Sequence, residues 1–232
     1  MPTILITGTN RGIGLELTQQ YAADGWRIYA CCRNPETADA LNALAAQSDG
    51  KVTVHKLDTC NDEQRHALAA ELAGIPIDIL FNNAGMYGNW DYQSFGSSDR
   101  NEWQNTLDAN VIAPMQMMET FVDNVAASEQ KLIANMSSKM GSMHDNGSGG
   151  SYIYRSSKAA LNAVCVSAAK NLAPRGIKVA VLHPGWVRTD MGGENGELSV
   201  EESASALRRN LASMTDDDSG RFMDIDGSTI PW

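Results

Sequence analysis

A tyrosine and a lysine four residues apart are the pair in this sequence best suited to moving a proton. Tyr154 and Lys158 fall in the segment 154–172, whose composition predicts a long helix. Residues i and i+4 of a helix share one face. A free phenol has a pKa near ~10, and a nearby ammonium favours the phenolate and lowers that pKa. The pair therefore predicts a tyrosine that exchanges a proton with a substrate oxygen, provided that the surrounding elements form a site.

Short apolar runs alternate with helical stretches along the whole chain. Strands are predicted at 3–7, 27–32, 52–57, 77–81, 131–136 and 177–182, with a seventh in the tail 221–232. Helices are predicted at 12–23, 36–47, 63–72, 102–126, 154–172 and 201–212. The strands are nearly continuous hydrophobic runs, which is typical of strands covered on both faces. We expect an α/β, single-domain Rossmann fold over 1–232, with a doubly wound parallel sheet.

Composition narrows the possible partners and compartment. The chain has 232 residues, of which 43% are hydrophobic, and a formal net charge of −10. Such an acidic chain has no electrostatic reason to bind nucleic acid or an anionic membrane surface. Four cysteines are too few for a disulfide framework at this length, and no cysteine–histidine cluster has the spacing of a zinc site. The lack of such a cluster predicts no metal. No leader or membrane-spanning run is evident, so we expect a cytoplasmic location.

The first strand is followed by a glycine-rich loop. Ligands of doubly wound folds bind at the carboxyl ends of the strands. There the segment 7–14 reads TGTNRGIG and leads into a helix. Glycines allow the backbone to approach a pyrophosphate, and the helix start offers free N–H groups to it. This predicts a dinucleotide site, whose contacts are expected from Gly8, Asn10, Arg11, Gly12, Ile13 and Gly14.

The end of the second strand distinguishes the two nicotinamide cofactors. NAD sites usually place an acid there to bind the ribose 2′-hydroxyl, whereas this strand ends in Arg33. Arg11 in the glycine loop is a second cation suited to the same place. Guanidinium groups bind a 2′-phosphate well. We therefore expect NADP(H) in preference to NAD(H).

An ordered set of motifs resembles the short-chain dehydrogenase/reductase family over nearly the whole chain. Each motif alone is weak, but their order and positions together are specific. The set consists of 7–14, Asp58, 82–85 (NNAG), Asn110, Ser138, Tyr154, Lys158 and 184–185 (PG). Within the family, the stretch 31–36 (CCRNPE) and the tail 226–232 resemble C-factor-like and Sniffer-type carbonyl reductases.

The resemblance implies a reaction and assigns roles to four residues. A carbonyl is reduced to an alcohol by hydride transfer from NADPH, and Tyr154 supplies the proton. Lys158 also holds the nicotinamide ribose, and Asn110 holds a water in a proton relay to this lysine. Ser138 hydrogen-bonds the carbonyl oxygen, with Ser137 as its rival for that role. Ser138 lies further before Tyr154 than in most relatives, because a glycine–serine insertion, 147–151, precedes the helix and is suited to widening or gating the site.

Further contacts with the cofactor follow from the same resemblance. Asp58 is expected to accept from the adenine amine, although a turn-capping aspartate is the alternative reading. The adenosine ribose is expected to pack on the backbone that ends the fourth strand. The nicotinamide carboxamide is expected to contact the end of the sixth. These two sets are Asn83, Ala84 and Gly85, and Pro184, Gly185, Val187 and Thr189.

Methionines and aromatic residues are predicted to line an adaptable apolar pocket for the substrate. No cation converges on this region, so we expect an apolar or aromatic carbonyl. The residues are Met86, Tyr87, Trp90, Met140, Met143, His144, Trp186 and Met191, of which His144 is alternatively a solvated loop residue. The glycine-rich segment 190–200 is expected to be a lid that is mobile without substrate.

Three other functions are less compatible with the sequence. An enoyl reductase of the family spaces its tyrosine and lysine more widely, and a halohydrin dehalogenase replaces the lysine by arginine and lacks the glycine loop. A different class is an NAD(P)-binding signalling protein of the C-factor type with little or no turnover. The complete Tyr154–Lys158 pair argues against it, because binding alone needs no proton donor.

Family members often pair through the helices predicted at 102–126 and 154–172, so a homodimer or homotetramer is expected, although related carbonyl reductases can be monomers.

Overall fold

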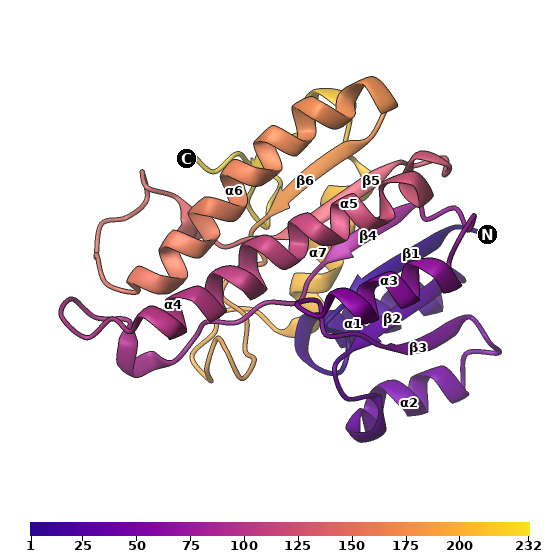
Figure 1. The fold of residues 1–232 in the computed structure, drawn as a ribbon, viewed down its shortest axis with the longest axis horizontal. Coiled ribbons are helices and arrows are strands. Elements are labelled where there is room, and N and C mark those ends of the chain that lie inside the picture. The colour runs from indigo at the N-terminus through magenta and orange to yellow at the C-terminus, as the bar shows by residue number, and fades with distance from the viewer.

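Seven parallel strands form one sheet through the centre of the molecule, in a computed structural model that describes residues 1–232 (Figure 1). The strands are β1 (Thr3–Thr7), β2 (Arg27–Cys32), β3 (Val52–Lys56), β4 (Ile79–Asn82), β5 (Leu132–Met136), β6 (Lys178–Leu182) and β7 (Phe222–Met223). Their order is β3-β2-β1-β4-β5-β6-β7. The chain runs outward in opposite directions from β1 and β4, so their carboxyl ends flank the crevice where doubly wound folds bind ligands. The α/β Rossmann fold is confirmed.

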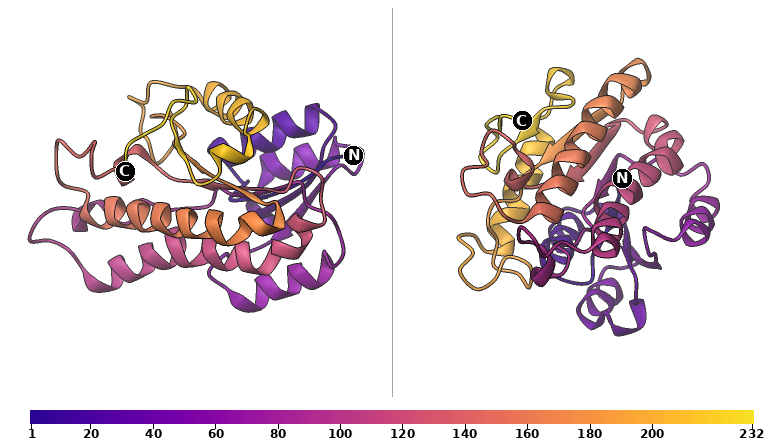
Figure 2. Two further views of the ribbon diagram at one scale, coloured as in Figure 1. Left: turned by 90° about the horizontal axis from the view of Figure 1, so that it is seen from above. Right: turned by 60° about the vertical axis from the view of Figure 1, so that its left-hand side comes forward.

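Helices cover both faces of the sheet (Figure 2). They are α1 (Gly12–Ala23), α2 (Asp39–Ala46), α3 (Asp62–Glu71), α4 (Arg100–Leu107), α5 (Ala113–Ala126), α6 (Tyr152–Leu172) and α7 (Val200–Ala212). One apolar core lies between the sheet and α1, α2 and α7, and includes Leu17, Leu41 and Leu207. The other lies beneath α3, α5 and α6, and includes Leu68, Phe121 and Leu161. Strands buried on both sides explain the continuous apolar runs. None of these helices combines the length and apolar character needed to cross a membrane.

Two predicted helices are interrupted. The segment 36–47 begins with a 3₁₀ turn at Pro35–Thr37, and α2 starts only at Asp39. The segment 102–126 is divided into α4 and α5 by a π-helical turn, Asp108–Ile112. Pro114 follows this turn and has no N–H to donate to the carbonyl of Asn110, four residues earlier. Periodicity does not reveal such a break, because the apolar pattern continues through it.

Candidate active site

The glycine loop forms a cradle at the start of α1. Gly8 and Gly12 have positive φ angles of 72° and 57°. A Cβ at Gly14 would lie 2.1 Å from the carbonyl oxygen of Gly8, so no side chain fits there. No side chain caps the start of α1, which leaves its first N–H groups free. The loop therefore has the two features that a bound pyrophosphate requires: a close backbone approach and open donors.

The end of β4 braces this loop. The Thr7 hydroxyl oxygen accepts from the backbone N–H groups of Asn83 (3.1 Å) and Ala84 (3.0 Å). The Asn83 amide donates to the carbonyl oxygens of Thr7 (2.8 Å) and Gly8 (3.1 Å). The sequence predicts a cofactor contact for Asn83, and the structure shows that its side chain also holds the glycine loop in shape. Thr7 was part of the motif but was not expected to have this role.

Tyr154, Lys158 and Ser138 meet at the carboxyl edge of the sheet. Tyr154 and Lys158 lie on α6, are only 7% and 4% exposed, and have the lysine nitrogen 5.7 Å from the tyrosine ring centre. Ser138 follows the end of β5 at Met136 by two residues, and its side chain lies beside the Tyr154 hydroxyl. Ser137 instead donates to the Asn162 side chain in the interior. The geometry thus favours Ser138 over Ser137 as the serine that reaches a substrate.

Burial determines the protonation of the pair. It raises the pKa of Tyr154 to about 12, with the Ser138 hydrogen bond opposing the rise and Tyr87 adding to it. It lowers the pKa of Lys158 to about 8. The expectation that Lys158 lowers the tyrosine pKa is therefore wrong for this structure: the lysine donates to the Met136 carbonyl oxygen (2.9 Å), and burial dominates. Tyr154 is a protonated phenol at neutral pH, which is the form that donates a proton.

Replacing Lys158 by methionine should stabilise the protein while removing function. The lysine pKa falls from 10.5 in the unfolded chain to about 8, so the cost of burying its charge is complete below pH 8 and disappears above pH 10.5. Removing the buried charge should raise the free energy of unfolding, and the loss of the hydrogen bond to the Met136 carbonyl oxygen should offset part of this gain. We expect a net increase on the order of 2 kcal/mol for Lys158→Met at neutral pH. Urea denaturation at pH 7 and pH 10.5 measures this, and a gain that is equal at both pH values would contradict it.

Asn110 lies in the π turn, and its side chain holds the loop that follows β4. Its side-chain oxygen accepts from the Met86 N–H (2.9 Å), and its amide donates to the Met86 carbonyl oxygen (2.8 Å) and to the Ser157 hydroxyl (3.0 Å). A Cβ on Gly85 would lie 3.1 Å from this amide oxygen and 3.4 Å from the Lys158 nitrogen. Asn110 thus lies beside the candidate catalytic pair Tyr154 and Lys158, and its part in a water relay stays a prediction.

Aromatic rings cover Tyr154. The Tyr87 ring lies 4.8 Å from the Tyr154 ring and stacks on Trp90 at 3.9 Å, while Trp90 itself is 62% exposed. The Tyr87 hydroxyl hydrogen-bonds Ser151 (2.7 Å), the last residue of the insertion 147–151. Gln93 is buried behind them, and its side chain bonds both the Tyr154 N–H (3.2 Å) and the Tyr87 carbonyl oxygen (2.9 Å). Gln93 was missed, because a glutamine in a polar loop gives no sequence signal.

The remaining residues predicted for the substrate are less closely grouped. Met140 lies in the turn after Ser138 and is half-buried. Met143 and His144 are exposed, and the His144 N–H donates to the Trp232 carbonyl oxygen. Trp186 and Met191 are also exposed. Contacts of these side chains with a substrate stay a prediction.

The segment after β6 is folded back on itself. The Trp186 indole donates to the Gly192 carbonyl oxygen (2.8 Å), and Val187 pairs with Leu198. A Cβ on Gly185 would lie 2.4 Å from the Leu198 side chain, which explains the glycine after Pro184. The last two residues of the predicted lid 190–200 belong to the start of α7, because Ser199 caps that helix and Val200 is its first residue. The function of the segment as a lid stays a prediction.

Three polar residues that were predicted to contact the cofactor lie in the segments that follow β1, β2 and β3. Arg11 forms an exposed ion pair with Asp190 (3.3 Å), and Arg33 is exposed at the end of β2. Asp58 accepts from the Cys60 N–H (3.0 Å), which is the turn-capping geometry considered as its alternative role. Asn10 is exposed, Ile13 packs against the core, and Thr189 accepts from the Gly192 N–H.

Comparison with known proteins assigns the family. The family model for short chain dehydrogenases matches residues 2–198, so the chain belongs to the short-chain dehydrogenase family of oxidoreductases. Among curated proteins, the C-signal of Myxococcus xanthus is 36% identical over 166 residues, which is 72% of this chain and 99% of that protein.

Two solved structures cover all of this chain. The carbonyl reductase Sniffer of D. melanogaster is 31% identical with a TM-score of 0.94, and the match covers 100% of that structure's chain. The NADPH-bound carbonyl reductase from chicken fatty liver is 30% identical with a TM-score of 0.93 and 99% coverage. The resemblance seen in the sequence is therefore confirmed.

Proposed function

We propose that this protein reduces a carbonyl to an alcohol with NADPH. The observation that carries the proposal is the meeting of Tyr154, Lys158 and Ser138 beside an uncapped glycine cradle at one edge of the sheet. NADPH, when bound, supplies the hydride. The cradle fits such a cofactor, because Gly14 leaves no room for a side chain and α1 offers its free donors.

The residues of the chain supply the proton and hold the oxygen. Tyr154 is buried and protonated, so it is ready to donate as negative charge develops on the carbonyl oxygen. Ser138 lies within hydrogen-bond reach of the same hydroxyl and is placed to stabilise that charge. Burial lowers the pKa of Lys158 to about 8, so this lysine can release a proton near neutral pH and is placed to return one to Tyr154.

Apolar or aromatic carbonyls are the substrates we propose. The Tyr87 ring packs on Tyr154, Trp90 stacks on Tyr87, and Met86 precedes Tyr87 in the same loop, which provides ring and thioether surfaces for such a substrate. The test is NADPH oxidation by the purified protein, measured with a panel of aldehydes, ketones and quinones. Turnover of aromatic members supports the proposal, and NADPH binding without turnover of any member contradicts it.

NADPH should be preferred to NADH because of Arg33 and Arg11. Arg33 is exposed at the end of β2 with no acid beside it in sequence, which suits a 2′-phosphate. We expect Arg33→Asp to lower the kcat/KM ratio of NADPH to NADH by about 100-fold, since it exchanges an attraction for a repulsion. Arg27→Asp, an exposed arginine at the opposite end of β2, is the matched control. An unchanged ratio in Arg33→Asp would contradict the assignment.

A signalling role is the second candidate, and the similarity to the C-signal favours it. In that case the protein binds NAD(P) with little turnover. The substrate panel distinguishes the two, because a protein that only binds should show tight NADPH binding and no oxidation.

Assembly as a homodimer or homotetramer stays a proposal that light scattering would test.

A further inference from the structure

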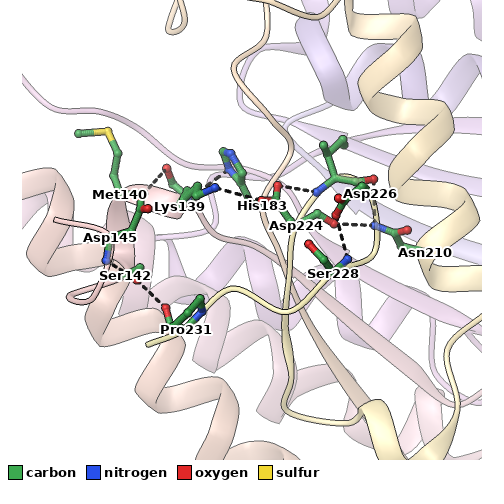
Figure 3. Close-up of polar contacts among 12 residues, drawn as sticks. Lys139, Met140, Ser142, Asp145, His183, Asn210, Asp224, Asp226, Ser228 and Pro231 are labelled. Atoms are coloured by element: carbon green, nitrogen blue, oxygen red, sulfur yellow. Dashed lines mark hydrogen bonds and ion pairs between the residues drawn. The ribbon is translucent and has the colours of Figure 1, made fainter. Parts of the chain in front are cut away.

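The short turn that follows Ser138 is held by a cluster of polar side chains that the proposed reaction does not use (Figure 3). This turn is the 3₁₀ segment Lys139–Gly141, which Ser138 caps. The Ser138 carbonyl oxygen accepts from the Gly141 N–H (2.7 Å), and its hydroxyl oxygen accepts from the Met140 N–H (3.2 Å). The direction of the serine hydroxyl therefore depends on where this turn sits.

His183 holds the turn from the end of β6. Its ring nitrogen Nδ1 accepts from the backbone N–H of Lys139 (3.2 Å), the residue directly after Ser138. Its own backbone N–H donates to the Met223 carbonyl oxygen (2.9 Å), which fixes the histidine against β7. Burial lowers the His183 pKa to about 4, so Nδ1 is an unprotonated acceptor at neutral pH.

Two further contacts confine the turn. The Lys139 side chain pairs with Asp224 (3.2 Å), whose backbone oxygen accepts from Asn210 of α7 (2.9 Å). On the other side, Gly141 packs on α6 so closely that a Cβ there would lie 2.9 Å from that of Lys158. The turn is thus held between α6 and the His183–Asp224 side, as Figure 3 shows for the latter.

We propose that His183 is a positioning residue, which holds the Lys139 amide and thereby directs the Ser138 hydroxyl at Tyr154. This inference rests on the proposed reductase function. Removing the acceptor leaves a backbone N–H without its partner. The turn then shifts to find another partner, and small displacements of a catalytic group are costly to rate.

Leucine and asparagine at position 183 test the proposal. His183→Leu removes the acceptor, and we expect kcat to fall about 10-fold with the Kd of NADPH unchanged. His183→Asn places its side-chain oxygen where Nδ1 was and should restore most of the rate. His66→Leu, an exposed histidine on α3, is the matched control. Equal losses in the leucine and asparagine variants would overturn the proposal.

The same substitution in a Ser138→Ala background separates positioning from general damage. If His183 acts through Ser138, His183→Leu should cost less than about 2-fold there. A 10-fold loss in both backgrounds would overturn the inference but leave the reductase function intact. A wild-type protein that turns over no carbonyl would instead overturn both.

Ring ¹⁵N chemical shifts of the wild-type protein provide a measurement that needs no turnover. We expect the His183 ring to be neutral at pH 7, with the proton on Nε2 and Nδ1 unprotonated. A proton on Nδ1 would overturn the proposal, because a protonated ring nitrogen has no lone pair and cannot accept a hydrogen bond from the Lys139 N–H.

Discussion

Tyr154→Phe should lower NADPH-dependent carbonyl reduction by about 1,000-fold while leaving NADPH binding unchanged. The substitution removes one oxygen from a ring that is otherwise held by Tyr87 and by the Gln93 contact with its backbone. Packing is therefore retained, whereas the proton donor and the partner of Ser138 are lost. Steady-state kinetics and fluorescence titration with NADPH measure the two quantities.

Tyr152→Phe is the matched control for this change. Tyr152 begins α6 two residues earlier, is half-exposed, and contacts Phe95 rather than the catalytic group. Its variant should keep its full rate. A Tyr154→Phe protein that retains more than about a tenth of wild-type kcat would show that another group supplies the proton.

Gly14→Ala should abolish NADPH binding and destabilise the fold by about 3 kcal/mol. The added methyl group would lie 2.1 Å from the Gly8 carbonyl oxygen and 2.5 Å from the Asn83 amide nitrogen. Both are parts of the brace between the glycine loop and β4, so the loop must move away from the strand. Thermal denaturation and NADPH titration measure the effect.

Gly25→Ala separates the steric effect from the backbone effect. Gly25 has a φ of 78° and open space around it, so alanine there strains only the backbone, at about 1 kcal/mol. NADPH binding should be intact in this variant. Equal NADPH affinities in the Gly14 and Gly25 variants would contradict the role assigned to the cradle.

The fold was predictable because its signals are local. Runs such as Thr3–Thr7 and Lys178–Leu182 are apolar on both faces, and a sheet buried on both sides requires that. The division of the long helix at Asp108–Ile112 was not predictable, because the hydrophobic pattern passes through the π turn unchanged. Periodicity reports which face is buried and not which hydrogen bonds are made.

The proximity of the candidate site residues was predictable, but their electrostatics were not. Tyr154, Lys158 and Ser138 were recognised by type and spacing, and the structure brings them together. The predicted direction of the tyrosine pKa was wrong, because that pKa depends on the burial of Tyr154 in the folded chain and on the contact of the lysine with the Met136 carbonyl oxygen. Gln93 and His183 reach the site only through tertiary contacts, for which the sequence gives no signal.

Transfer of deuterium from labelled NADPH tests the central claim most directly. The protein is incubated with an aromatic ketone and with NADPH deuterated at one or the other position of nicotinamide C4. The mass of the alcohol product is then measured by mass spectrometry. Hydride transfer predicts that one of the two labelled cofactors yields an alcohol heavier by one mass unit, and that Tyr154→Phe yields almost none. Tight NADPH binding with no labelled alcohol from any carbonyl offered would contradict the account.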